Sequence, residues 1–97
     1  MTRNTETVVI RSSGPVHHPV PDDFVTVEVM CEPGEVATGW GFSGDSDPKH
    51  FGSIRHATPI PDSPGATPTG FTFVVRSGTQ NLHFEGYVLC ARPGPNS

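Results

Sequence analysis

Strict alternation of apolar and polar residues is clearest in Phe-Val-Thr-Val-Glu-Val-Met-Cys, residues 24–31, where valines occupy every second position. Because side chains alternate between the two faces of a strand, the three valines and Cys31 share one face. The same period recurs in residues 82–91, where an apolar set that ends at Cys90 alternates with mostly polar residues. Both segments are therefore predicted to be strands with one buried face.

Four further apolar segments have the length and composition of short strands. They are residues 5–12, 36–43, 51–57 and 71–76. The chain contains 11 glycines and 11 prolines, which cluster between the apolar segments and predict turns there. The 14 valines and isoleucines outnumber the two leucines, a balance that favours strands over helices.

Two proline-rich stretches are predicted to lie outside the central strands. Residues 13–23 hold three prolines and are expected to form an extended connector. Residues 58–70 hold four prolines and are expected to form a long, stiff loop. Loops of this length in a compact domain often have a binding role.

The segment 36–43 is unusual because one of its faces is almost without side chains. Simple alternation puts the larger residues on one face: Val36, Thr38, Trp40 and Phe42. The other face carries Ala37, Gly39 and Gly41. We expect this small-residue face to permit the close approach of another backbone or of large side chains.

These elements predict an all-β fold, a small antiparallel β-sandwich or barrel of six to seven short strands without a substantial helix. A chain of 97 residues has room for one domain. We expect an extended N-terminal arm and connector in residues 1–23, a sandwich domain in 24–92 and a loose C-terminal tail in 93–97.

Cys31 and Cys90 each lie near the end of a predicted strand, on its inward face. A disulfide between them would close a loop of about 59 residues and stabilise the fold by about 4 kcal/mol. The alternative is a pair of reduced core thiols in a cytosolic protein. The N-terminus lacks the apolar segment of a secretory signal peptide. We expect the disulfide, in a protein that is assembled in the cytosol and works outside the cell, as in a virus particle.

The charge pattern and the length of the apolar runs argue against two classes of partner, nucleic acid and membrane. The formal net charge is −4, and the six basic residues are scattered along the chain. Without a basic patch to neutralise phosphates, nucleic-acid binding is not expected. No apolar run approaches the roughly 18 residues of a membrane-spanning helix, so we expect no membrane partner.

No catalytic or metal motif is recognisable: the sequence lacks Gly-x-Ser-x-Gly, His-Glu-x-x-His and phosphate-binding glycine loops. The acidic residues that could pair as acid and base are Asp22, Asp23, Glu28, Asp45, Asp47 and Glu85. The histidines lack the close spacing of zinc ligands: His17, His18, His50, His56 and His83. The Asp-Ser-Asp run at 45–47 begins like a calcium loop but lacks its later ligands. We expect no enzymatic activity, no metal site and no cofactor.

The run from Cys31 to Ser43, Cys-Glu-Pro-Gly-Glu-Val-Ala-Thr-Gly-Trp-Gly-Phe-Ser, resembles the opening of a group of small β-sandwich domains. Those domains occur in actinobacterial secreted proteins and in phage tail and other virion proteins, and open with Cys-Pro-Ala-Gly-Lys-Val-x-x-Gly-Gly-Gly. Two later pieces are similar as well, Gly70-Phe-Thr-Phe-Val74 and Gly86-Tyr-Val-Leu-Cys-Ala91. This chain departs from the pattern where proline follows Glu32 and where Trp40 replaces the middle glycine.

The resemblance covers about residues 24–92 and implies a cysteine-bridged structural or binding module without catalysis. A contact platform for a sugar ring or a peptide is one interpretation of three aromatic residues: Trp40, Phe51 and Tyr87. The other interpretation makes Trp40 a core anchor beside the disulfide. The apolar arm Val8-Val9-Ile10 either adds an edge strand to its own sheet or reaches a neighbouring subunit by strand addition.

We therefore expect a non-enzymatic virion protein of a bacteriophage that infects a high-GC host. It would be an accessory coat component that decorates the capsid or is mounted on the tail. Made in the host cytoplasm and exposed after release, it would contact neighbouring virion proteins and its own copies as a homo-oligomer. The alternative is a carbohydrate-binding adhesion module that recognises a bacterial cell envelope.

Overall fold

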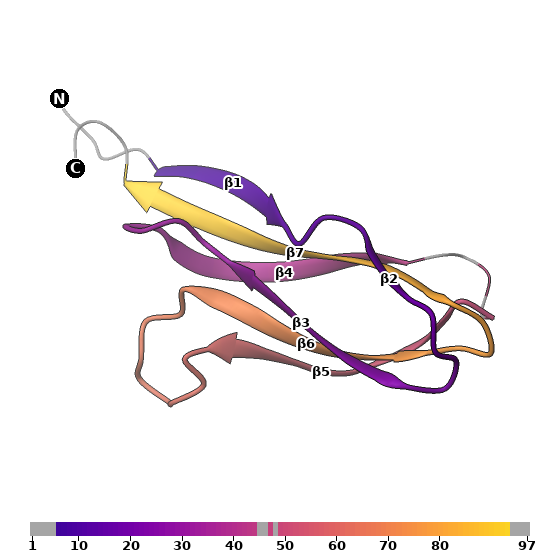
Figure 1. Cartoon of the computed structure of the whole chain (residues 1–97). Coiled ribbons are helices and arrows are strands. Elements are labelled where there is room, and N and C mark those ends of the chain that lie inside the picture. Colours follow the sequence, from indigo (N-terminus) through magenta and orange to yellow (C-terminus); the bar gives the residue numbers. More distant parts are fainter. Residues whose placement is uncertain (1–5, 45–46, 48, 94–97) are drawn as a thin grey trace, which may run out of the picture.

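The computed structural model describes residues 6–44, 47 and 49–93. Their β-strands form two antiparallel sheets (Figure 1). The strands are β1 (Glu6–Ser12), β2 (Val16–His18), β3 (Phe24–Met30), β4 (Val36–Gly44), β5 (Phe51–Ile60), β6 (Gly70–Ser77) and β7 (Leu82–Pro93). No helix occurs among the described residues, and the sheets pack as a sandwich. The predicted all-β antiparallel class is confirmed, as a sandwich and not as a closed barrel.

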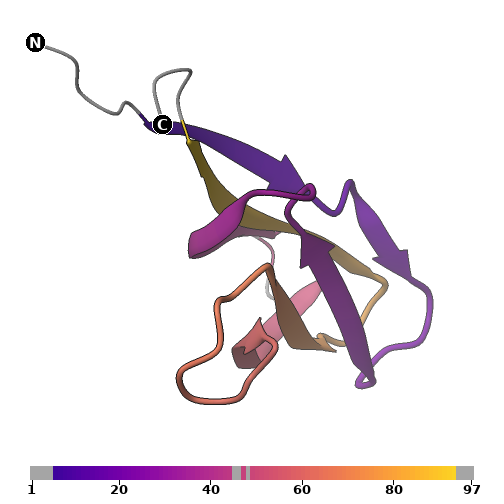
Figure 2. The same ribbon diagram turned by 90° about the vertical axis from the view of Figure 1, so that its left-hand side faces the viewer.

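Sheet A is built on β7, the longest strand. Along one edge of β7, β2 pairs with the first part of the strand and β1 with the rest, while β4 pairs along the other edge. Sheet B has the order β3-β6-β5. Figure 2 shows the two layers from one end, with β1 and β2 on the same side of the sandwich as β3, and β4 on the same side as β5.

The core lies between β6 and β7, the central strands of the two sheets. Its fully buried hydrophobic side chains are Phe73, Val75, Leu82, Val88 and Cys90. Val27 and Val29 of β3 are also buried, so the alternation predicted for residues 24–31 and 82–91 is confirmed. Gly86 lies on the same face, where an added Cβ would approach the Phe73 ring to 3.0 Å. The missing side chain therefore makes room for that ring.

Two strands extend into stretches that were predicted to be loops. β2 lies inside the predicted connector and continues the edge of sheet A beyond the end of β1. Pro15 and Pro19 flank β2, and an edge position tolerates their missing N–H donors. β5 runs through Pro59 to Ile60 at the edge of sheet B, so the long loop covers residues 61–69 instead of 58–70.

A β-bulge between Ala37 and Gly39 changes the two faces predicted for β4. A bulge places one extra residue in one strand and reverses the alternation beyond it. Ala37 and Trp40 therefore both face the core, opposite buried residues of β7, although simple alternation separated them. Thr38 occupies the bulge, where its hydroxyl donates to the carbonyl of Leu89 at 3.2 Å.

Candidate functional site

A shallow apolar groove lies on the outer face of sheet A, the face turned away from sheet B. This outer groove has a volume of about 420 Å³ and is lined by Ile10, Trp40, Gly41, Tyr87 and Leu89. Three adjacent strands, β1, β7 and β4, contribute these residues. Apart from the Tyr87 hydroxyl and the Trp40 indole nitrogen, the side chains of the lining are hydrocarbon.

The outward face of β4 carries two glycines, of which Gly41 gives the outer groove its depth. At Gly41 no atom lies within 4 Å of where a Cβ would stand. Leu89 lies over Gly39, its partner in β4, so closely that an added Cβ would come within 3.1 Å of Leu89 Cδ1. The expectation that a large side chain approaches this small-residue face is therefore confirmed at Gly39.

Exposed aliphatic side chains on β1 extend the outer groove into a larger apolar surface. Val8 and Ile10 are 57% and 66% exposed. Val9 points the other way and packs against the core. The candidate arm residues thus pair with β7 of their own chain, as one of the two interpretations expected, and two of them remain exposed on the outer face.

Three aromatic side chains form a row along the side of the sandwich between β4 and β5: Trp40, Phe42 and Phe51. In this aromatic row, Phe42 stacks with Trp40 at 6.3 Å and with Phe51 at 5.6 Å between ring centroids. Trp40 also meets the buried Phe73 ring edge-on at 5.6 Å. Trp40 is 42% exposed: its side chain belongs to the inward face of β4, and the residue also lines the outer groove at the edge of sheet A.

The predicted platform is divided between these two surfaces. Trp40 and Tyr87 share the outer groove, whereas Phe51 belongs to the aromatic row and does not line the groove. The platform prediction missed Phe42, which is 46% exposed. Its position two residues after Trp40 is the signal that could have identified it, because alternation puts both side chains on one face.

The opposite side of the sandwich carries the disulfide. Cys31, just after β3, is bonded to Cys90 of β7, with the two Cα atoms 5.8 Å apart. The bond joins sheet B to sheet A. The predicted Cys31–Cys90 disulfide is therefore confirmed, and it fixes the distance between the sheets at this end of the molecule.

A buried ion pair lies next to the disulfide. Glu35, in the turn before β4, is 6% exposed, and its carboxylate accepts two hydrogen bonds from the Arg11 guanidinium, at 3.2 and 2.6 Å. The backbone N–H of Glu32 also donates to Glu35 Oε1, at 3.0 Å. The hydrogen bond from Arg11 holds the pKa of Glu35 below its usual value, and the same bond raises the pKa of Arg11. Glu35 therefore stays ionised and ties β1 to the turn.

In the part of the chain that the structure describes, one group of metal-ligating side chains already has its ligand atoms within 4.8 Å of one another: Cys31, Glu35 and Cys90. Both sulfur atoms are bonded to each other, and the carboxylate is held by Arg11. These groups do not form a donor set for an ion. In the calcium-like run, Asp45 lies outside the described residues, and the Asp47 carboxylate accepts from the Lys49 N–H at 3.0 Å.

The acidic residues considered as an acid–base pair are spread over the surface. Asp22 forms an ion pair with an arginine of β6. Asp23 is paired with His18 at 2.9 Å, and this hydrogen bond lowers the pKa of Asp23. Glu28 lies on β3 and Glu85 on β7, in different sheets. Asp22 and Asp23 are thus each held by a basic side chain, and Glu28 and Glu85 are divided between the two sheets.

The chain matches no protein-family model, no curated protein and no solved structure. None of the described residues belongs to a helix that could cross a membrane. The outer groove and the aromatic row are the exposed apolar features on which a partner could bind.

Proposed function

We propose that this chain is a non-enzymatic assembly protein that holds a neighbouring protein on the outer face of sheet A. The observation that carries the proposal is the outer groove, an open apolar surface bordered by the exposed Val8 and Ile10. Contiguous exposed apolar surface on a small protein marks a contact site, because its burial removes it from water.

The setting that we propose is a bacteriophage virion, with the chain as an accessory coat component on head or tail. The resemblance of the run from Cys31 to Ser43 to sandwich domains of virion proteins suggests this setting. The disulfide suits a protein that is exposed outside the cell. An assembly of many copies also supplies neighbours whose contacts stabilise a small domain.

The edge position of β1 offers a second mode of contact with the same neighbour. β7 occupies one edge of β1, and its other edge is the border of sheet A. A strand from a neighbouring subunit would extend sheet A there by main-chain hydrogen bonds. Val8 and Ile10 would then lie beside the outward side chains of the added strand, so strand addition and apolar contact would reinforce each other.

A carbohydrate-binding adhesion module is the second candidate, favoured by Trp40 and Tyr87 in one groove. Sugar recognition needs an aromatic face together with several polar groups that bind the ring hydroxyls. The side chains of the outer groove offer one phenol hydroxyl and one indole N–H. We therefore rank protein contact above glycan contact.

The decisive experiment compares two variants in phage particles purified on a density gradient. Ile10→Lys places a charge in the outer groove, and Val20→Lys is a matched control, because Val20 is 48% exposed but lies in the loop after β2. Mass spectrometry measures copies per particle against the major coat protein. We expect normal incorporation of Val20→Lys and strong loss of Ile10→Lys, with both variants folded by circular dichroism.

Three outcomes would contradict parts of this proposal. Absence of the wild-type chain from particles would overturn the virion setting. Equal incorporation of the two variants would overturn the outer groove as the contact surface. A shift of Trp40 fluorescence on titration with envelope glycans, lost in Tyr87→Ala, would favour the adhesion module.

A further inference from the structure

Three histidines that are far apart in the sequence meet at the end of sheet A remote from the disulfide: His17, His50 and His83. In this histidine cluster, His17 and His83 lie directly opposite each other on β2 and β7. Their ring centroids are 4.8 Å apart, with an interplanar angle of 73°. His50, just before β5, stacks on His83 at 4.5 Å and 19°.

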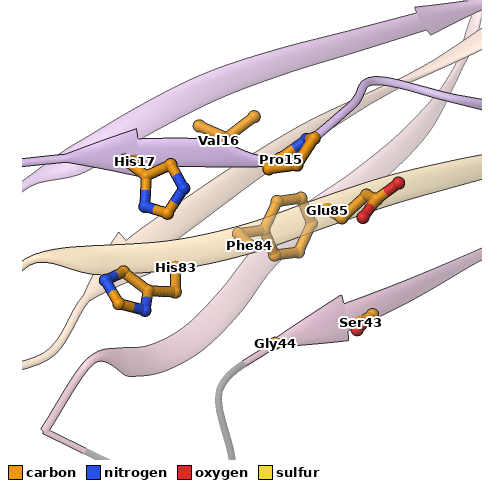
Figure 3. Close-up of a pocket in the computed structure, with 8 residues that line it drawn as sticks. All are labelled: Pro15, Val16, His17, Ser43, Gly44, His83, Phe84 and Glu85. Carbon is orange, nitrogen blue, oxygen red and sulfur yellow. The ribbon is translucent and has the colours of Figure 1, made fainter.

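Open space surrounds the histidine cluster on two sides. A pocket of about 220 Å³ is lined by His17, His83 and Glu85 among others. Figure 3 shows the two imidazoles near each other at one end of this pocket and the Glu85 carboxylate at the other. A second pocket, of about 370 Å³, is lined by His50 and His83. An ion and its bound waters can therefore reach the three rings from solvent.

We propose that the histidine cluster binds a divalent transition-metal ion of the kind that prefers imidazole, with Zn²⁺ and Ni²⁺ as the probes. Imidazole nitrogen is a common ligand of both ions. Directly opposed residues on antiparallel strands have Cβ atoms about 4.5–5.5 Å apart, which allows His17 and His83 to hold one ion between them. His50 supplies a third imidazole, and water completes the coordination.

The rings now touch by face and edge, so binding turns their nitrogens toward a shared point. The χ2 torsion of histidine has broad minima, which permits this rotation. Glu85 is on the same face of β7, two residues after His83, and its carboxylate adds negative charge at the other end of the pocket (Figure 3). These features suit a site of moderate affinity whose coordination geometry forms when the metal ion binds.

The metal site is independent of the proposed assembly function. Tyr87 of the outer groove follows His83 by four residues, about 13 Å along β7. Metal binding and docking of a neighbouring protein can therefore be tested separately, and failure of one leaves the other standing.

The test titrates the full chain, purified without a polyhistidine tag and treated with chelator, with ZnCl₂ and with NiCl₂ by calorimetry. We expect one ion per chain and a rise of melting temperature of about 5 °C at saturating metal. His83→Asn, which removes the central imidazole, is expected to weaken binding more than about tenfold. His56→Asn is the matched control, because His56 is exposed on β5 outside the cluster.

Should His83→Asn fail to fold, the imidazole proton resonances of the wild-type chain provide a second measurement. Selective shifts of His17, His50 and His83 with unchanged His56 would support the site. The proposal is overturned if neither ion binds at about 1 mM, a concentration that corresponds to very weak affinity. It is also overturned if His83→Asn binds like the wild type, or if His56→Asn weakens binding equally.

Discussion

The two long sides of the sandwich are closed in different ways (Figure 2). Beside β1 and β3, covalent and ionic bonds link separate elements: the Cys31–Cys90 disulfide and the Arg11–Glu35 ion pair. Between β4 and β5, the stacked rings of the aromatic row close the side. The first side uses directional bonds, whereas the second leaves Trp40 and Phe42 42% and 46% exposed.

This difference separates the residues that stabilise the fold from the residues that remain available to contact a partner. Bonds between the sheets hold the first side in place without any partner. Aromatic packing holds the second side but leaves apolar surface exposed to water. A neighbouring protein that covers this surface lowers the free energy of the system. We therefore expect substitutions at the disulfide and at the Arg11–Glu35 pair to act on folding, and substitutions in the aromatic row to act on folding and on association.

The largest expected effect is at the disulfide. Cys31→Ser should lower the free energy of unfolding by about 4 kcal/mol, because the unfolded chain regains the entropy of a 59-residue loop. Guanidinium denaturation of the two proteins in oxidising buffer measures the difference. Reductant should destabilise the wild type by a similar amount and leave Cys31→Ser unchanged. A wild type that is insensitive to reductant and as stable as Cys31→Ser would show that the bond contributes nothing.

A smaller loss is expected in the aromatic row. Phe42→Ala removes stacking on Trp40, Phe51 and the buried Phe84, whose ring centroid is 6.1 Å away. A fully buried Phe→Ala change costs about 3–5 kcal/mol, so a half-exposed ring should cost about 2 kcal/mol. Thermal denaturation measures this loss. If Phe42→Ala cost as much as Cys31→Ser, the two sides would not differ in the way proposed.

Acid should act through the ion-paired side. Because the pKa of Glu35 is lowered, its stabilising effect is full above the usual carboxyl pKa of 4.5 and is lost as pH falls through the lowered pKa. Glu35→Gln should therefore be less stable than the wild type at neutral pH. The difference in melting temperature between the two proteins should become smaller below about pH 4. Melting temperatures from pH 7 to pH 2.5 measure both curves.

The hydrogen bond from His18 also lowers the pKa of Asp23, so part of the acid dependence should survive in Glu35→Gln. Asp23→Asn is the matched control, because it removes the other carboxylate with a lowered pKa. If the melting temperatures of the wild type and Glu35→Gln differ by a constant amount down to pH 2.5, the role assigned to the Arg11–Glu35 pair is contradicted.

The buried faces of β3 and β7 could be predicted from the sequence because a two-residue period determines them wherever the strand is regular. The same rule was wrong for β4, where Thr38 is an extra residue in a bulge. A bulge is a local insertion that depends on the partner strand, and the composition of the segment does not mark it. The prediction therefore separated Ala37 from Trp40, although both face the core.

Contacts between distant segments were beyond the reach of the sequence pattern. Arg11 and Glu35 are 24 residues apart and meet because β1 lies along β7 above the turn. His17 meets His83 because β2 continues the edge where β1 ends. Nothing in residues 13–23 indicates this pairing, since their prolines favour an extended connector. The disulfide could be predicted because regular alternation puts Cys31 and Cys90 on the inward faces of residues 24–31 and 82–91.

The smallest expected effect distinguishes the two outward-facing glycines of β4, Gly39 and Gly41. Gly41→Ala meets no atom within 4 Å, so it should stabilise the strand by about 0.5 kcal/mol through the lower entropy of the unfolded chain. Gly39→Ala would place its Cβ 3.1 Å from Leu89 Cδ1, and Leu89 must move, which should cancel that gain. The added methyl at position 41 also makes the groove shallower. Chemical denaturation should therefore rank Gly41→Ala above Gly39→Ala, while Gly41→Ala weakens association through the outer face. An equal gain at both positions would mean that Leu89 moves freely and does not form a fixed wall.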